Sequence, residues 1–257
     1  MRFDGATEVK WAGPGRYTTE VDAVWGIGGS PNGGYLMAIL ARATLAHTGA
    51  PAPLVVSAEF LRPTRSGSAQ VEASTVKPGR TATHAAATLR QGGVAAVTAT
   101  VVLGAAIGPP TGPGEACRVA PEADCVPFSF GAGPPNLLQR MEVRYEPGYG
   151  PHDDGPAVVR GWVRLLSGEE PDALVALLAA DALAPATFRL GYRSWSPTVQ
   201  MTVQLHRAPG PGALAVEVVA GELRDGWFDE AATVWDSAGV LVARGRQLAR
   251  LPRADPV

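Results

Sequence analysis

Residues 62–88 read RPTRSGSAQVEASTVKPGRTATHAAAT, and the chain returns to this pattern 145 residues later, where residues 207–233 read RAPGPGALAVEVVAGELRDGWFDEAAT. The two stretches share seven identities without a gap, against about two expected by chance for this composition. Such a repeat predicts a duplicated unit. Two copies of one unit should form a pseudo-twofold pair with a cleft between them.

The order of secondary structure around the repeat is similar in both halves. A segment of helical periodicity precedes several period-2 segments that are separated by Gly and Pro, which indicates one helix and several short strands. We therefore expect an N-terminal repeat over residues 1–110, a Pro- and Gly-rich linker over 111–135 and a C-terminal repeat over 136–257. The expected helices are 33–47 and 171–183, and the expected strands are 54–61, 69–76, 83–90, 94–103, 139–145, 158–166, 198–206, 213–221, 230–236 and 240–251.

Charge and cysteine content exclude several classes of protein. Lys and Arg number 22 against 24 Asp and Glu, so the net charge of −2 favours neither nucleic acid nor an anionic membrane as partner. The two cysteines, Cys117 and Cys125, are too few for a disulfide framework or a zinc site. No signal peptide is recognisable at the amino terminus, and Pro109 interrupts the uncharged stretch 91–114 before it reaches the ~20 apolar residues of a membrane span. We expect a cytoplasmic protein without a metal.

One carboxylate lies where the helical pattern predicts a core leucine. Leu174, Leu177, Leu178 and position 181 follow the i, i+3, i+4, i+7 spacing of a buried stripe, and position 181 is Asp. Asp181 is either a residue near the helix end that bonds local backbone, or a partly desolvated carboxylate with a raised pKa. The second kind suits a general base near neutral pH.

Two strand residues raise the same question. Alternation places Thr198 on a polar face, which a solvated surface also explains. Gln247 is the one polar side chain on the uncharged face of its strand, and an unbonded buried amide costs roughly 1 to 3 kcal/mol. At the repeat offset Thr198 corresponds to Pro53, and with a shift of one residue Gln247 corresponds to Val101. A structural role should tend to persist in both copies, so the difference favours a single site.

The first helix opens with small residues. In the run GGSPNGGY, residues 28–35, Ser30 is an acceptable N-cap and Pro31 a favoured first helical residue. The backbone N–H groups at the glycines would be uncovered, so the helix start can polarise a carbonyl or hold an oxyanion. Close packing of the helix explains the glycines equally well. The run is neither a Walker A loop nor a nucleophile elbow. The candidate substrate-binding residues are Asn32, Gly33, Gly34 and Tyr35.

Four short strings occur in order along the chain: Trp25 followed by PNGGY at 31–35, ADALAP at 180–185, SPTVQMT at 196–202 and GVLVARGRQ at 239–247. Together they resemble the acyl-CoA thioesterase II-like family of double-hotdog proteins, and the resemblance covers almost the whole chain. It implies an α+β double hotdog, in which each repeat is a long central helix wrapped by an antiparallel sheet.

The resemblance also implies a catalytic set. In that family an Asp, a Thr or Ser, and a Gln activate water for thioester hydrolysis, and by motif these are Asp181, Thr198 and Gln247. Two features depart from the family pattern. Gln200 stands where members often have an acidic residue, and the first helix opens with Asn-Gly-Gly in place of Gly-Gly-Gln.

We expect an acyl thioester hydrolase of lipid metabolism that needs no cofactor and acts on acyl-CoA or an acyl-phosphopantetheine carrier. Water is the expected nucleophile, because Thr198 has no adjacent His or Lys to activate it. Joining two repeats pairs one sheet edge, so the monomer is already a pseudo-dimer, and a homo-oligomer is also compatible. Two alternative functions are those of a hotdog hydratase or lyase and of a non-catalytic acyl-thioester-binding module.

Overall fold

The computed structural model describes residues 2–105, 107–108, 114–128, 136–192, 194 and 196–251. Within these residues, 13 strands form one antiparallel sheet, and a further pair forms a two-stranded sheet. The helices are α1 Phe3–Ala6, η1 Ala23–Trp25, α2 Gly33–Thr48, η2 Glu122–Asp124, η3 Asn136–Gln139, α3 Ala173–Ala179 and η4 Ala186–Leu190. The strands are β1 Lys10–Gly13, β2 Arg16–Val21, β3 Gly26–Ile27, β4 Ser30–Pro31, β5 Ala52–Phe60, β6 Gly67–Lys77, β7 Ala82–Gln91, β8 Val94–Gly104, β9 Val126–Pro127, β10 Met141–Tyr145, β11 Val158–Leu165, β12 Thr198–Leu205, β13 Leu214–Arg224, β14 Trp227–Trp235 and β15 Leu241–Arg250.

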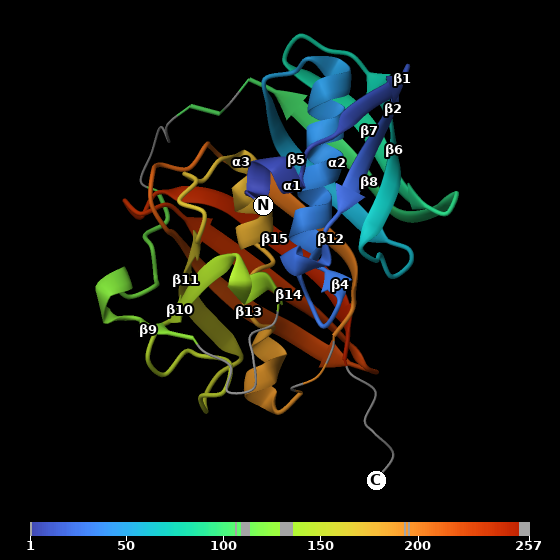
Figure 1. Cartoon of the computed structure of the whole chain (residues 1–257). Helices are drawn as coiled ribbons and strands as arrows, with labels where there is room; N and C mark the ends of the chain where they lie inside the picture. The colour runs from blue at the N-terminus through green and yellow to red at the C-terminus, as the bar shows by residue number, and fades with distance from the viewer. Residues whose placement is uncertain are drawn as a thin grey trace.

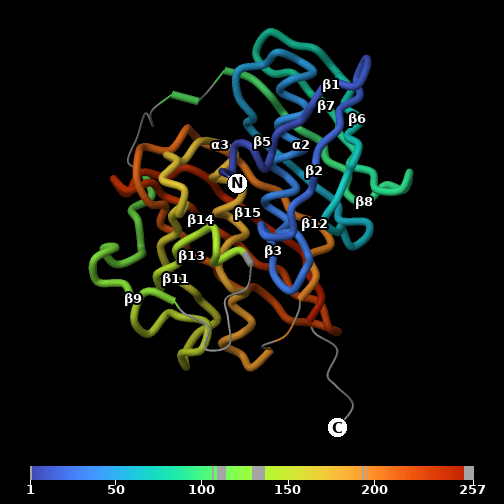
Figure 2. The backbone as a smooth tube through the Cα atoms, viewed as in Figure 1, coloured from blue at the N-terminus to red at the C-terminus, as the bar shows by residue number. Residues whose placement is uncertain are grey.

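The strand order of the large sheet is symmetric about its middle. It runs β1-β2-β6-β7-β8-β5-β12-β15-β14-β13-β11-β10-β9, so β6-β7-β8-β5 is followed by β12-β15-β14-β13. At the central pair, Ser57 of β5 lies opposite Thr202 of β12, and these positions differ by the repeat offset. Figure 2 shows the blue-to-teal half and the yellow-to-red half on the two sides of this junction. The order supports two repeats, and their boundaries stay a prediction.

Helix α2 occupies the concave face of the first half. It contacts β5, β6, β7 and β8, and Figure 1 shows it lying in front of these strands. Leu36, Met37, Ile39 and Leu40 are buried in the main core. The helix ends at Gly49, whose φ of 69° suits a left-handed C-cap. The expected helix over 33–47 is therefore confirmed.

The second helix is shorter than expected. Asp172 caps α3 by accepting from the backbone N–H groups of Leu174 and Val175 at 2.9 and 2.8 Å. The helix ends at Ala179, and the N–H of Asp181 turns back to the carbonyl of Leu178 at 3.1 Å. A long central helix is thus not confirmed in the second half.

Strands β1 and β2 were not predicted from the sequence. They extend the sheet beyond β6, and their short length and polar outer face give a weak periodic signal. The other strands of the large sheet, apart from two-residue β9, lie within a few residues of the expected ranges.

Part of the expected linker is folded. Residues 114–128 lie against the outer face of the second half, where the indole N–H of Trp162 donates to the carbonyl of Ala120 at 2.8 Å. The indole of Trp235 donates to the carbonyl of Glu115 at 3.2 Å. Residues 111–113 and 129–135 of that linker lie outside the described residues. No helix in the described ranges has the length and apolarity to cross a membrane.

Candidate active site

Asp181 meets the N-terminus of α2. The backbone N–H of Gly34 donates to Asp181 Oδ2 at 3.1 Å, and Asn32 Nδ2 donates to the backbone carbonyl of Asp181 at 2.6 Å. Asn32 is also the N-cap of α2, because its Oδ1 accepts from the N–H of Tyr35 at 3.0 Å. A helix from one half and a carboxylate from the other therefore build one site.

The cap differs from the expectation. Ser30 and Pro31 form strand β4, which pairs with β3, and α2 begins at Gly33. Asn32 takes the capping role because its amide oxygen reaches the N–H three residues on.

Close packing accounts for one of the two glycines, and the oxyanion role stays a prediction. A Cβ at Gly34 would lie 2.3 Å from the carbonyl oxygen of Leu177, so close packing of α2 on α3 requires glycine there. A Cβ at Gly33 would lie 3.0 Å from Asp181 Oδ2 and 3.0 Å from Phe60 Cζ. Gly33 therefore leaves room for the carboxylate to approach the helix end.

The environment of Asp181 suits proton transfer. Burial raises the pKa of its carboxyl to about 6, while hydrogen bonds from the amides of Gly34 and Gly33 and from Asn32 lower it. A carboxyl with that pKa is mostly ionised at pH 7 and can still accept a proton. The sequence left open whether Asp181 bonds local backbone or is a desolvated base, and the structure combines long-range backbone bonds with desolvation.

The predicted substrate-binding residues divide into two groups. Asn32, Gly33 and Gly34 contact or face Asp181, and the N–H of Gly34 is bonded to that carboxylate. The side chain of Tyr35 lies away from it, fully buried, with its hydroxyl donating to the carbonyl of Ala6 at 2.9 Å. Burial raises the pKa of Tyr35 to about 12. Its side chain packs the core behind the helix start.

Thr198 and Gln247 lie in contact. Thr198 Oγ1 donates to Gln247 Oε1 at 2.5 Å, and Gln247 Nε2 donates to Glu230 Oε2 at 2.9 Å. The other oxygen of Glu230 accepts from the backbone N–H of Ala186 at 2.6 Å. We call Thr198, Gln247 and Glu230 the polar row. Its hydrogen bonds leave the lone pairs of Thr198 Oγ1 free to accept another donor.

A β-bulge brings Thr198 to this row. In the pairing of β12 with β15, Met201 lies opposite Gln247, whereas Thr198 lies opposite Ala249 instead of position 250. The extra residue is Val199, whose side chain is exposed. A bulge shifts the alternation by one residue. The expectation that Thr198 lies on the polar face is therefore wrong, and it shares the inner face with Gln247.

The bulge also places Gln200 on the other side of the sheet. Gln200 Nε2 donates to Ser57 Oγ at 3.1 Å and to Thr202 Oγ1 at 2.8 Å. Gln200 thus contacts residues of the sheet junction and has no bond to the polar row among the described residues.

Glu230 was not among the residues predicted from the sequence. It is 3% exposed, and burial raises its pKa to about 7, with the charge of Asp181 raising it too and the bonds from Ala186 and Gln247 lowering it. A signal was present, since Glu230 alternates in phase with Phe228, Ala232 and other apolar residues of β14.

Asp181 lies in the neighbourhood of the polar row. A Cβ at Gly245 would lie 3.6 Å from the Cβ of Ala180, so the segment before Asp181 lies on β15, two residues from Gln247. Asp181 interacts electrostatically with Glu230. Asp181, Thr198 and Gln247 are each half-buried, which leaves the site open to a ligand. Within the described residues no His, Cys, Asp and Glu side chains group in a way that could hold a metal.

Two protein-family models match the parts of the chain that build this site. A model of the acyl-CoA thioesterase N-terminal domain matches residues 21–104, and a model of the acyl-CoA thioesterase C-terminal domain matches residues 115–251. The chain belongs to the acyl-CoA thioesterase family. The C-terminal match contains Asp181 and all of the polar row, and the N-terminal match contains the start of α2.

Individual relatives are similar to this acyl-CoA thioesterase family member over almost the whole chain. An uncharacterised protein of Mycobacterium tuberculosis is 34% identical over 91% of this chain and 90% of its own length. The crystal structure of a candidate thioesterase II from Thermobifida fusca is 36% identical, with a TM-score of 0.90 over 98% of both chains. A hotdog-fold protein of unknown function from Alicyclobacillus acidocaldarius is 25% identical, with a TM-score of 0.89 and 98% coverage of both. The fold is that of hotdog proteins.

Proposed function

We propose that this protein hydrolyses acyl thioesters, with a water molecule as nucleophile and without a cofactor. One observation carries the proposal: a desolvated carboxylate, Asp181, is held at the N-terminus of α2 near the polar row in a member of the acyl-CoA thioesterase family. The division into two repeats at residues 110 and 136 belongs to the same proposal.

In the proposed mechanism Asp181 is the general base. Its carboxylate takes a proton from water, and the resulting hydroxide attacks the thioester carbonyl. Thr198 Oγ1 accepts the second hydrogen of that water, because its own proton is directed to Gln247. The tetrahedral intermediate then collapses, the C–S bond breaks, and the leaving thiolate takes the proton from Asp181.

Glu230 positions Gln247 in this scheme. As an acceptor it fixes the NH2 group of Gln247, so the amide oxygen faces Thr198. That orientation sets the direction of the hydrogen bonds: the water donates to Thr198, Thr198 to Gln247 and Gln247 to Glu230, while the N–H of Ala186 donates to Glu230 from the other side.

The start of α2 has two proposed tasks. The N–H of Gly34 orients Asp181 in the free protein, and the positive end of the helix stabilises negative charge that develops on the carbonyl oxygen. An oxyanion role for Gly33 and Gly34 therefore requires that the substrate oxygen share these donors with Asp181.

The proposed substrates are thioesters of coenzyme A or of a carrier-bound phosphopantetheine. A cytoplasmic location, a monomer or homo-oligomer, and the absence of nucleic-acid or membrane partners remain part of this proposal. The location and the absence of these partners rest on the charge and composition of the sequence, and the assembly rests on the pairing of sheet edges.

A thiol-release assay with acyl-CoAs of several chain lengths tests the function. We expect turnover by the wild type and a loss in kcat of about 10² or more in Asp181→Asn, the scale for removing a general base. Asp124→Asn makes the same chemical change at an exposed residue of η2 and should leave kcat unchanged. Acyl-CoA binding without thiol release in the wild type would replace hydrolysis by the non-catalytic binding module. Full activity of Asp181→Asn would refute the mechanism.

A further inference from the structure

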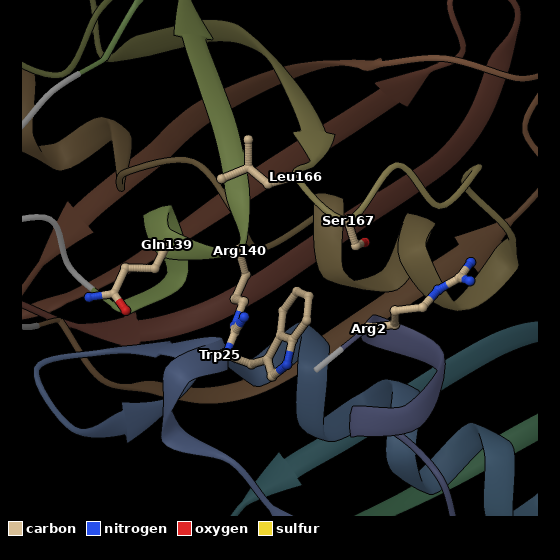
Figure 3. A pocket seen from close by; sticks show the side chains of 6 residues that line it. All are labelled: Arg2, Trp25, Gln139, Arg140, Leu166 and Ser167. Atoms are coloured by element: carbon tan, nitrogen blue, oxygen red, sulfur yellow. The ribbon is translucent and has the colours of Figure 1, made fainter.

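A cavity outside the candidate active site opens beside the amino-terminal segment. It encloses about 370 Å³ and is lined by Arg2, Trp25, Gln139, Arg140, Leu166 and Ser167. Figure 3 shows Trp25 coming to it from η1, Arg140 from the residue before β10, and Arg2 from the residue before α1. None of these residues belongs to the Asp181 site or to the polar row.

Two of the residues that line this cavity have a buried hydrogen-bond donor without a partner in the described part of the chain. Trp25 is only 1% exposed, and its Nε1–H is unbonded within the described residues. Arg140 Nε is buried and likewise unbonded in the described part of the chain. Buried polar groups are normally paired, so two unpaired donors on residues that line one cavity call for an acceptor.

The indole of Trp25 is held by its neighbours. The carbonyl of Trp25 accepts from the N–H of Asn32 at 2.9 Å, and its indole lies between the rings of Phe3 and Tyr35, with centroid distances of 5.0 and 6.2 Å. The indole therefore cannot turn easily toward another acceptor.

The backbone of Arg140 is fixed by two hydrogen bonds. Its N–H donates to the carbonyl of Leu137 at 2.9 Å, and its carbonyl accepts from the N–H of Leu166 at 2.9 Å. Its backbone joins η3 to the sheet through these two bonds.

The cavity is positively charged. Its lining contains two arginines and no acidic residue. Arg2 is paired with Glu169 at 3.3 Å, whereas no carboxylate of the described residues forms an ion pair with Arg140. Residues 129–135, outside the described part, include no Asp or Glu in the sequence. The uncompensated charge is therefore that of Arg140.

We infer that this cavity is a binding site for an oxyanion, a carboxylate or phosphate group of a small ligand. One oxygen would accept from Trp25 Nε1–H, and a second from Arg140 Nε–H, with the guanidinium supplying the opposite charge. Gln139 and Ser167 offer further polar contacts at the mouth. The site does not depend on the proposed hydrolysis.

Indole N–H signals in a proton–nitrogen NMR spectrum report directly on Trp25. The chain has six tryptophans, and Trp25→Phe assigns the signal by its loss. At constant ionic strength, titration with inorganic phosphate or with acetate should move the Trp25 signal downfield and saturate, and chloride should not. A shift with only one of the two anions would identify the bound group as a phosphate or a carboxylate. Either result supports the site.

Arg140→Met removes the charge and keeps the apolar stem. It should weaken oxyanion binding at least about tenfold, the loss of one charge-assisted bond. Arg164→Met, at a half-exposed arginine paired with Glu122, should bind as the wild type does. If Trp25→Phe does not fold, the phosphate-induced rise in the melting temperature of the wild type, compared with Arg140→Met, gives the same answer. No saturable effect of either anion, or equal binding by Arg140→Met, would overturn the inference.

Discussion

The inner faces of the two halves have the same backbone arrangement, but one contains a row of polar side chains and the other has apolar ones at the same positions. In the second half Glu230, Gln247 and Thr198 form a hydrogen-bonded row. The corresponding positions of the first half, Ala85, Val101 and Pro53, are apolar and buried. Ala85 lies opposite Val101 in β7 and β8, just as Glu230 lies opposite Gln247 in β14 and β15.

Even the bulge is present in both halves. Pairing shifts between Pro53 and Val55 in β5 and between Thr198 and Gln200 in β12. The backbone thus offers both halves the same place for a side chain next to the helix, and only one half fills it with a hydroxyl. The comparison teaches that the fold supplies the geometry of the site but does not by itself supply its function.

Converting the polar row to its apolar counterpart is the strongest test of this comparison. We expect the double variant Glu230→Ala with Gln247→Val to lose about 10² in kcat, because Thr198 loses its acceptor and the water its orientation. Its free energy of unfolding should fall by less than the sum of the losses in Glu230→Ala and Gln247→Val, because the bond between these two side chains is lost only once, although the N–H of Ala186 loses its acceptor.

The single variant Gln247→Val provides the contrast. It leaves the carboxyl of Glu230 buried without that bond, so urea denaturation should show a loss of roughly 1 to 3 kcal/mol. A loss in the double variant equal to the sum of the losses in the two single variants would mean that the row is not a coupled unit.

The stability of the wild type should depend on pH through Asp181. Burial raises its folded pKa to about 6 from 3.8, so the stabilising contribution is complete below pH 3.8 and is lost as the pH rises through about 6. Asp181→Asn removes this dependence. At pH 7.5 we expect the variant to be more stable than the wild type by roughly 1 to 3 kcal/mol, and at pH 4 to have no such advantage.

Urea denaturation of both proteins across this pH range is the measurement. An advantage of the variant that did not change between pH 4 and pH 7.5 would contradict the raised pKa. In the same window the wild-type kcat should fall as the pH drops below about 6, because the base becomes protonated.

Thr198→Ala should have a smaller effect on activity. We expect a loss in kcat of about tenfold, since one hydrogen bond to the water disappears while Asp181 remains. Combined with Gln247→Ala the losses should be less than additive, because both residues serve one water. Additive losses in steady-state kinetics would indicate separate roles.

Gln200→Glu should have the smallest effect. The family pattern places an acidic residue at this position, but Gln200 faces Ser57 and Thr202 on the far side of the sheet. We expect kcat to change by less than about twofold, as for a substitution away from the site. A large gain in activity would show that the two faces communicate.

Much of the fold could be read from periodicity. Strands such as 94–103 and 240–251 alternate clearly, and the helix over 33–47 is strongly apolar, so their positions are confirmed within a few residues. The end of the second helix could not be predicted, because positions 174, 177, 178 and 181 keep helical spacing although the helix ends at Ala179.

The sequence predicted most residues of the candidate site, but it did not predict the sheet face on which each of them lies. Asp181 and Gln247 stand out because they interrupt apolar patterns, whereas the bulge at Val199 has no signal in an alternating sequence, so Thr198 was placed on the wrong face. Glu230 corresponds to Ala85 at the repeat offset, so the same difference between the halves that marks Gln247 also marks Glu230.

The central pairing of Ser57 with Thr202 has a consequence for stoichiometry. If the junction joined two identical chains, positions related by the symmetry would carry the same residue in both chains. Such an assembly would contain two sites or none. A single chain that contains both halves is free to differ at positions 85 and 230. We therefore expect titration with a tight-binding substrate analogue to end at one equivalent per chain, with the second, symmetry-related place unable to hold the water.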